Sequence, residues 1–221
     1  MVYATMCVGK EWNREFKKSI KNFAENNILY ILTDSPESYQ NNLTVKYERK
    51  VFSYFEKIRF IFDIIKINSK RVTYIDANKI KKYNANILFN DEKIYTGRLF
   101  SLEHLYKYYF TSTTLSDIGL IFEKIGVKDL KHYLSSLADK KYPREHILSV
   151  PYLINIEEII NDLKIIQPYL ESYYNSVPRT PSLKRYSEVG VGYAEGWALV
   201  AIAIKYGLEI KSLNWEKKSL I

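Results

Sequence analysis

The chain has very little cysteine, and it lacks long apolar runs. Its single cysteine, Cys7, excludes an internal disulfide framework and a zinc site built from cysteines. Because Cys7 lies within an apolar run, we expect it to be a small buried residue rather than a nucleophile. No stretch of about 18 or more apolar residues occurs, which predicts no transmembrane helix. Residues 1–10 lack the pattern of a secretory signal, so we expect a cytoplasmic protein.

The chain also lacks the glycine-rich fingerprints of the common nucleotide-binding folds. No G-x-G-x-x-G follows the first predicted strand, and no G-x-x-x-x-G-K-[ST] occurs anywhere. The histidines, His104, His132 and His146, are far apart and show no paired-ligand spacing. A histidine metal site or a Ser-His-Asp triad is therefore not indicated. If this fold binds a nucleotide, it does so through residues other than a glycine-rich loop of these types.

Size and charge set the broad class. With 221 residues, 47% of them hydrophobic, the chain can bury a core, and we expect one domain over residues 1–221. The formal net charge of +8 favours anionic partners, such as nucleotides, nucleic acid, an acidic glycan or a membrane surface. The charge does not choose among these partners, because the lysines are scattered along the chain rather than gathered in one block.

Hydrophobic periodicity over residues 1–78 predicts alternating strands and helices. The predicted strands span residues 2–8, 28–32, 43–47 and 72–75, and the predicted helices cover 12–23 and 52–65. The order β-α-β-β-α-β is typical of an α/β fold with a mostly parallel sheet and helices on its faces.

The rest of the chain is less regular. We expect two short strands within 84–100, helical pieces over 101–142, and a strand over 147–153 whose Pro151 suits an edge or a bend. A strong helix covers 156–174, a second helix at 194–206 ends at Gly207, and a last strand follows over 208–213. Residues 175–192 predict a long loop, of the kind that often serves as a functional lid.

A carboxylate and an amide follow the strand at 72–75. Asp76 and Asn78 are two residues apart, so strand alternation would point both side chains the same way. In open α/β sheets, ligands bind outside the carboxyl ends of the strands, where two such oxygens could hold a hard cation against a diphosphate. The alternative is that both residues only cap the helix or turn that follows.

These residues together carry a resemblance. An apolar N-terminal strand, a strand ending in Thr-Asp, and a helix with an aromatic-basic segment lead into Tyr-Ile-Asp-Ala-Asn at 74–78. This arrangement resembles the GT-A glycosyltransferases, especially the glycogenin-like and blood-group-transferase-like branches, whose D-x-D motif ends a strand. The resemblance implies a Rossmann-like, mixed but mostly parallel sheet, with a nucleotide-binding half at 1–80 and an acceptor-side half at 81–221.

The resemblance also assigns roles to residues. It implies that the nucleotide part of a UDP- or GDP-sugar contacts the ends of the first two strands, the preceding helix and the motif, through Tyr3, Ala4, Thr5, Thr33, Asp34, Arg59, Asp76, Ala77 and Asn78. Asp76 and Asn78 would hold Mn²⁺ or Mg²⁺. Because Asn78 replaces an aspartate, one negative charge is missing, and the affinity for a divalent ion should fall. Arg59 and Lys79 could neutralise the diphosphate instead.

The tail carries a second match, Gly-Tyr-Ala-Glu-Gly-Trp-Ala-Leu at 192–199, which opens a helix after a loop. The resemblance implies that Glu195 acts with Asp76 in catalysis, as the carboxylate near the acceptor hydroxyl. The alternative is that Glu195 only complements the helix dipole. Glu188 and Asp117 are reserve candidates, Trp197 is a candidate for acceptor stacking, and Arg179, Lys184 and Arg185 could close over the diphosphate.

The sequence therefore predicts an enzyme that moves a sugar from a nucleotide-diphosphate donor to a hydroxyl of a glycan or glycoprotein, with no nucleic-acid partner. Two alternatives remain open. A sugar-phosphate nucleotidyltransferase shares the α/β layout, although Gly9-Lys10 is a poor version of its usual glycine-rich signature. A basic nucleic-acid-binding module fits the charge, although no helix-turn-helix, zinc or RNA-binding signature occurs.

Overall fold

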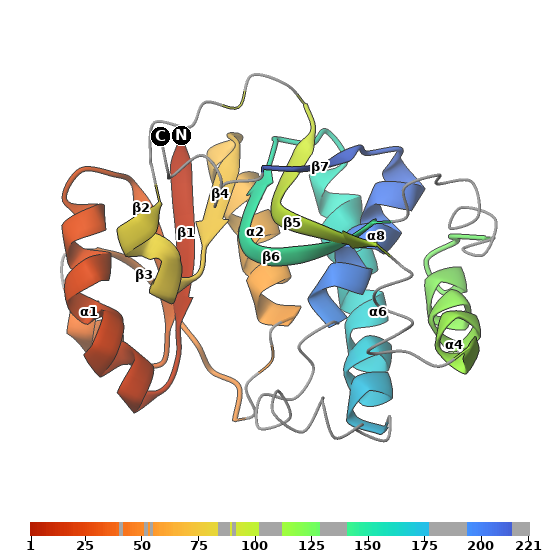
Figure 1. Ribbon diagram of the computed structural model, residues 1–221, viewed down its shortest axis with the longest axis horizontal. Coiled ribbons are helices and arrows are strands. Elements are labelled where there is room, and N and C mark those ends of the chain that lie inside the picture. The colour runs from red at the N-terminus through yellow and green to blue at the C-terminus, as the bar shows by residue number, and fades with distance from the viewer. Residues whose placement is uncertain are drawn as a thin grey trace.

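A computed structural model describes residues 1–39, 42–50, 53, 55–83, 89, 92–101, 112–128, 141–176 and 194–213. Its centre is a seven-stranded sheet with the order β3-β2-β1-β4-β6-β5-β7 (Figure 1). The strands are β1 Val2–Cys7, β2 Leu29–Thr33, β3 Leu43–Lys46, β4 Val72–Ile75, β5 Ile94–Ser101, β6 Lys141–Val150 and β7 Ile210–Ser212. The α/β class and the mostly parallel, mixed sheet are as predicted, and strands from both halves of the chain join this one sheet.

Strand direction follows from the pairing. β1 pairs in parallel with β2 and with β4, and β2 pairs in parallel with β3. β6 is antiparallel to both β4 and β5, and β5 is parallel to β7. β6 therefore runs against all the other strands of the described sheet. Because β6 lies between β4 and β5, the prediction of an edge strand is wrong, and Pro151 lies just beyond its end.

Helices cover both faces of the sheet (Figure 1). The helices are α1 Lys10–Ala24, α2 Phe55–Asn68, α4 Ser112–Glu123, α6 Ile156–Ser176 and α8 Ala194–Tyr206, with 3-10 helices η1 Pro36–Tyr39 and η2 Ala77–Lys82. One core unites α1, η1 and η2 with one face, and a larger core unites α2, α4, α6 and α8 with the other. The side chains of β1 alternate between the two cores, with Tyr3 and Cys7 in one and Ala4 and Met6 in the other.

The predicted elements of residues 1–78 are confirmed in order and approximate position. Helix α2 buries side chains around most of its circumference, because it lies between the sheet and helices α6 and α8. Cys7 is buried as predicted, and burial raises the pKa of its thiol. In the middle of the chain, the strand expected at 147–153 begins six residues earlier, at Lys141. Of the two strands expected within 84–100, the described residues contain β5.

The second half also confirms two helices. α6 and α8 match the helices predicted at 156–174 and 194–206, and α6 contains Pro168. The predicted loop at 175–192 begins two residues too early, because α6 includes residues 175 and 176. Residues 177–193 lie outside the described residues, and with them the candidates Arg179, Lys184, Arg185 and Glu188. None of the helices in the described ranges combines the length and apolar character needed to cross a bilayer.

Gly207 ends α8 with a backbone that favours glycine, at φ 64°. A Cβ at this position would meet no atom within 4 Å, so the cost of Gly207→Ala is conformational alone, about 1 kcal/mol. The matched control is Gly119→Ala inside α4, where a Cβ also meets no atom within 4 Å. We expect this control to stabilise the protein by up to about 1 kcal/mol, since alanine favours helix. Urea unfolding of both variants tests the prediction, and shifts of the same sign would contradict it.

Candidate functional site

The candidate site lies where parallel strands end. Val8 and Gly9 follow β1, Asp34 follows β2 and Asp76 follows β4, and we call this side of the sheet the carboxyl edge. From β1 the chain passes through α1 to β2 on one side, and it later returns through α2 to β4 on the other side of β1. The winding direction therefore reverses between β1 and β4. Such a switch point leaves a crevice at the carboxyl ends, where α/β sheets bind their ligands.

Asp34 and Thr33 hold the start of α1. Asp34 accepts hydrogen bonds from the Gly9 N–H at 3.0 Å and from Asn13 Nδ2 at 2.9 Å. The Thr33 hydroxyl donates to Asn13 Oδ1 at 3.1 Å and accepts from the Ser35 N–H at 3.1 Å. Thr33 is fully buried, whereas Asp34 is exposed. Both residues thus have a structural role, and contact with a base or ribose stays a prediction that exposure favours for Asp34.

Tyr3, Ala4 and Thr5 lie too deep in the sheet to meet a ligand with their side chains. They are 4%, 0% and 0% exposed. The Tyr3 ring packs edge-on against Phe23 and Tyr83, and the Thr5 hydroxyl donates to the Ile75 carbonyl at 2.7 Å. Because β1 continues to Cys7, a ligand at the carboxyl edge would instead meet the half-buried Val8 and Gly9. The side chains of these three residues therefore offer a nucleotide almost no surface, and their contact with it stays a prediction.

Asp76 occupies the end of β4 beside the switch point. Its backbone carbonyl accepts from the Lys79 N–H at 2.8 Å and so begins η2, but its carboxylate makes no capping hydrogen bond. The side chain is 22% exposed. Asp76 therefore begins η2 with its backbone only. Its carboxylate does not cap η2, in contrast to the alternative given above.

Asn78 and Ala77 belong to η2 rather than to an extended strand. Strand alternation no longer applies beyond Ile75, so the argument that Asp76 and Asn78 must point the same way fails. Asn78 is exposed and Ala77 is buried at 4% exposure. Both lie at the predicted strand end, but Ala77 has little surface to offer a ligand.

Lys57 is a site residue that the sequence analysis missed. Its Nζ lies 3.9 Å from Asp76 Oδ1 and 5.1 Å from the centre of the Tyr74 ring. The side chain is 2% exposed. One signal was available, because a lysine in the first turn of a helix opposes the helix dipole and among apolar neighbours calls for an anionic partner. The identity of that partner depends on the tertiary structure.

These residues do not fit a divalent-cation site. A carboxylate paired with a buried ammonium and an exposed neutral amide are weak ligands for a hard cation. Within the described ranges, no group of three or more His, Cys, Asp and Glu side chains gathers that could hold a metal ion. The predicted Mn²⁺ or Mg²⁺ site at Asp76 and Asn78 is thus not supported by the chemistry of its ligands.

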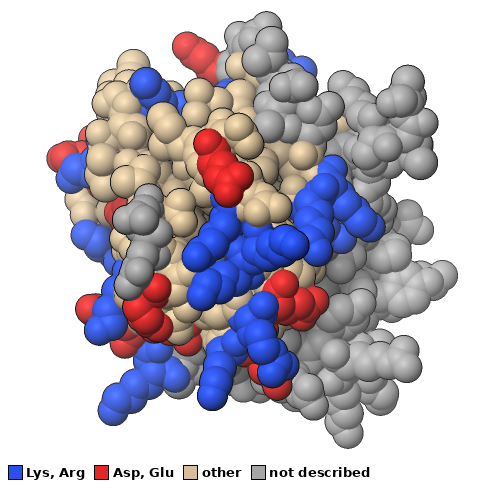
Figure 2. All heavy atoms as spheres, turned by 90° about the vertical axis from the view of Figure 1, so that its left-hand side faces the viewer, with Lys and Arg blue, Asp and Glu red and all other residues tan. Residues whose placement is uncertain are grey.

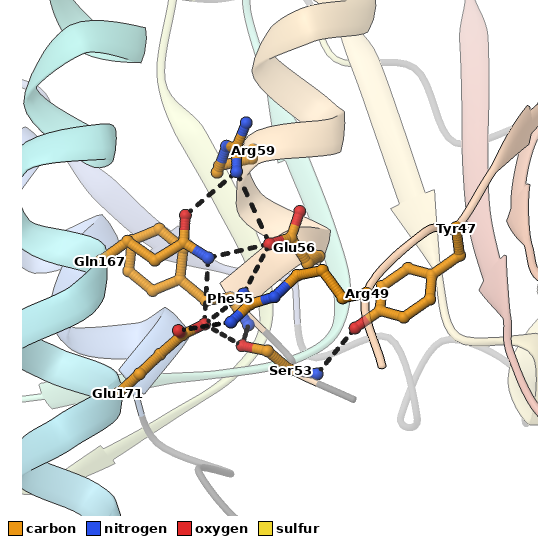
Figure 3. A network of polar contacts seen from close by, with 8 residues as sticks. All are labelled: Tyr47, Arg49, Ser53, Phe55, Glu56, Arg59, Gln167 and Glu171. Carbon is orange, nitrogen blue, oxygen red and sulfur yellow. Dashed lines mark hydrogen bonds and ion pairs between the residues drawn. The ribbon is translucent and has the colours of Figure 1, made fainter. Parts of the chain in front are cut away.

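Arg59 lies on α2 within a polar cluster (Figure 3). Its Nη1 donates to Gln167 Oε1 at 3.2 Å and lies 3.6 Å from Glu56 Oε1. Its side chain remains 32% exposed, and its Nε is buried without a hydrogen bond. Arg59 is therefore held from the α6 side, and its side chain remains partly exposed.

The rest of this cluster ties the start of α2 to α6. Arg49 donates to both oxygens of Glu171, at 2.8 and 2.9 Å, and to Glu56 Oε1 at 2.8 Å. Ser53 caps α2 by accepting from the Phe55 N–H at 3.2 Å, and its hydroxyl donates to Glu171. Burial alone would raise the pKa of Glu171, but the hydrogen bonds from Arg49, Ser53 and Gln167 lower it below its ordinary value. The cluster fixes the helix turn that carries Lys57 and Arg59.

Glu195 lies in the first turn of helix α8, and its side chain is outside the described part of the structure. Lys205 and Tyr206, at the end of α8, bond Asp162 in the first third of α6, at 2.8 and 2.7 Å. The start of α8 therefore lies beside the last turns of α6, near the start of α2. Trp197 is fully buried and packs against Phe122 of α4, so its predicted role in acceptor stacking is wrong. Asp117 is exposed on α4.

A basic surface covers the face formed by α1 and η2 (Figure 2). Its exposed cations are Lys10, Arg14, Lys18, Lys21, Lys81 and Lys82. Glu11 and Glu15 interrupt it on α1. The basic surface begins beside Gly9 and Asp76, because α1 follows β1 and η2 follows β4. The tertiary structure thus gathers lysines that are scattered in the sequence.

Comparison with known proteins adds no assignment. No protein-family model matches the chain, and no curated protein matches it. The geometry of the carboxyl edge is therefore the evidence on which a function rests.

The polar cluster predicts a specific response to acid. Because the pKa of Glu171 is lowered on folding, its stabilising contribution is complete above the ordinary glutamate pKa of about 4.3 and is lost as the pH falls below it. We expect Glu171→Gln to lower the free energy of unfolding at neutral pH by about 2 kcal/mol and to flatten the loss of stability in acid. Unfolding midpoints measured from neutral pH to pH 3 test this.

The matched control is Glu157→Gln, at the exposed start of α6, where the carboxylate pairs with Lys66 in solvent. A surface pair of this kind contributes little, so we expect a much smaller change. Equal effects of the two variants would show that the cluster does not hold α2 to α6.

Proposed function

We propose that the protein is a glycosyltransferase that moves a sugar from a nucleoside-diphosphate donor to a hydroxyl of a glycan or glycoprotein. The observation that carries this proposal is the Asp76 carboxylate. It lies beside the switch point between β1 and β4, is partly exposed, makes no capping bond and is paired with Lys57. Such a position fits a residue that faces a ligand better than one that only ends a strand.

The charges of the carboxyl edge suit a diphosphate. The starts of α1 and α2 lie at this edge, so their dipoles favour negative charge there. Lys57 and Arg59 add two cations near the start of α2, with Lys57 on the side of β4 and Arg59 on the side of α6. Negative charge builds on the diphosphate as the sugar departs, and preoriented cations stabilise that charge most effectively where water is excluded.

Glu195 supplies the acceptor side of the proposal. Its helix begins near the last turns of α6, which the polar cluster joins to the start of α2. In a transfer that inverts the sugar carbon, a carboxylate must take the proton of the attacking hydroxyl, and Glu195 is the residue we assign to that role.

A second candidate function is polyanion binding, which the basic surface on α1 and η2 favours. A nucleic-acid-binding module would use these lysines on phosphates, and its affinity would fall steeply with salt. A salt-sensitive gel shift with RNA or DNA, without any response to nucleotides, would favour this function over the transferase.

The proposal predicts that UDP or GDP stabilises the protein. At a nucleotide concentration of 100 times the dissociation constant, the stabilisation is about 2.7 kcal/mol, which a thermal-shift assay detects. Asp76→Ala should remove the response and abolish sugar transfer. The control is Glu209→Gln, which lies on the opposite side of the sheet, just before β7, and should keep both. An unchanged response in Asp76→Ala would remove Asp76 from the site.

Glu195→Gln separates binding from transfer. If Glu195 takes the acceptor proton, the variant binds the nucleotide as the wild type does but transfers sugar about a hundredfold or more slowly. Donor consumption and nucleotide-induced thermal shift, measured on the same preparation, test this. Wild-type transfer by Glu195→Gln would show that Glu195 only complements the helix dipole.

A further inference from the structure

We propose that Lys57 is a built-in counter-ion at this site, and that the protein binds a nucleoside diphosphate without a divalent cation. This inference rests on the proposed function for its ligand, but its structural basis is independent of that function. The basis is the pairing of the buried Lys57 ammonium with Asp76, 3.9 Å away.

Lys57 is fixed in place. Its side chain is 2% exposed, it projects from the first turns of α2, and its ammonium lies 5.1 Å from the centre of the buried Tyr74 ring. The polar cluster of Arg49, Ser53 and Glu171 holds the start of α2 against α6. A charge held in this way needs no reorganisation when a ligand arrives, which is the condition under which a cation is most effective at a reacting centre.

The pairing also opposes a metal ion. A divalent cation on the Asp76 carboxylate would lie close to the Lys57 ammonium, and repulsion between like charges is strong where solvent is largely excluded. Asn78 contributes no charge to offset that repulsion. The weak ligands Asp76 and Asn78 and the positive charge of Lys57 therefore both disfavour a divalent cation.

The charge balance gives the same result. Two aspartates with a divalent cation carry no net charge, and Asp76, Asn78 and Lys57 together also carry none. Compared with a motif of two aspartates and a metal ion, this site has one carboxylate fewer and an ammonium in place of the metal ion. The net charge is therefore the same. A diphosphate would meet the same net local charge as in a site of two aspartates and a metal ion.

The test compares UDP and GDP binding, by titration calorimetry, in EDTA and in millimolar Mn²⁺. We expect equal affinity in both conditions for the wild type. Lys57→Met should weaken binding in EDTA by about tenfold or more, because the remaining carboxylate repels the diphosphate. The double variant Lys57→Met with Asn78→Asp places a second carboxylate two residues after Asp76 and removes the ammonium, and its binding should become dependent on Mn²⁺. The matched control is Lys66→Met, on the exposed end of the same helix, which should behave as the wild type.

Electron paramagnetic resonance of Mn²⁺ added to the protein alone gives a readout that needs no nucleotide. We expect no bound Mn²⁺ in the wild type and bound Mn²⁺ in the double variant, and far-UV circular dichroism confirms that the variants fold. Wild-type protein that binds Mn²⁺ at Asp76, or that binds nucleotide only with Mn²⁺, overturns the inference. If no nucleotide binds under any condition, the proposed function fails, and the Mn²⁺ result alone decides whether Lys57 excludes the metal ion.

Discussion

The structure depends on the pairing of β1 on both sides. β1 is the first strand in the sequence, yet it lies inside the sheet between β2 and β4, and its side chains enter the cores on both faces. Since later segments add to either side of this strand, α1 and α2 must lie on opposite faces. The crevice at the carboxyl edge is a direct consequence, because the two connections leave β1 in opposite directions.

A second layer of interactions gives that edge its rigidity. The start of α2 is joined to the second half of α6 by Arg49, Ser53, Gln167 and Glu171, in a cluster where the carboxylates accept several hydrogen bonds. Charge-assisted bonds of this kind are strong when both partners are partly shielded from water. Arg59 belongs to this cluster and Lys57 lies in the same turns of α2, so the cluster fixes the positions of both cations.

The carboxyl edge has two electrostatic features, and each acts on an anionic ligand over a different distance. The basic surface on α1 and η2 is exposed and suits general attraction of anions, which salt screens. In the pair of Lys57 and Asp76 the ammonium is buried and the carboxylate is 22% exposed, and this pair acts only over short distances. The first feature concentrates an anionic ligand near the molecule, whereas the second determines what can bind at the end of β4. The transferase proposal rests on the second.

Local patterns in the sequence determined the elements, and the tertiary structure decided their partners. The strands and helices of residues 1–78, the end of α8 at Gly207 and the burial of Cys7 could be predicted, because each depends on periodicity or on the chemistry of a few neighbouring residues. The position of β6 inside the sheet and the pairing of Arg49 with Glu171, 122 residues away, could not be predicted.

The residues of the candidate site also divide into those that local sequence patterns indicate and those that only tertiary contacts reveal. The sequence located Asp76 at a strand end and named Arg59 as a candidate for the diphosphate and Trp197 as a candidate for acceptor stacking, but it missed Lys57. Each of these depends on which face of a helix meets which neighbour. A hydrophobic pattern reports that a side chain is buried or exposed on average, whereas the partner of a buried charge is set by contacts between segments far apart in the chain.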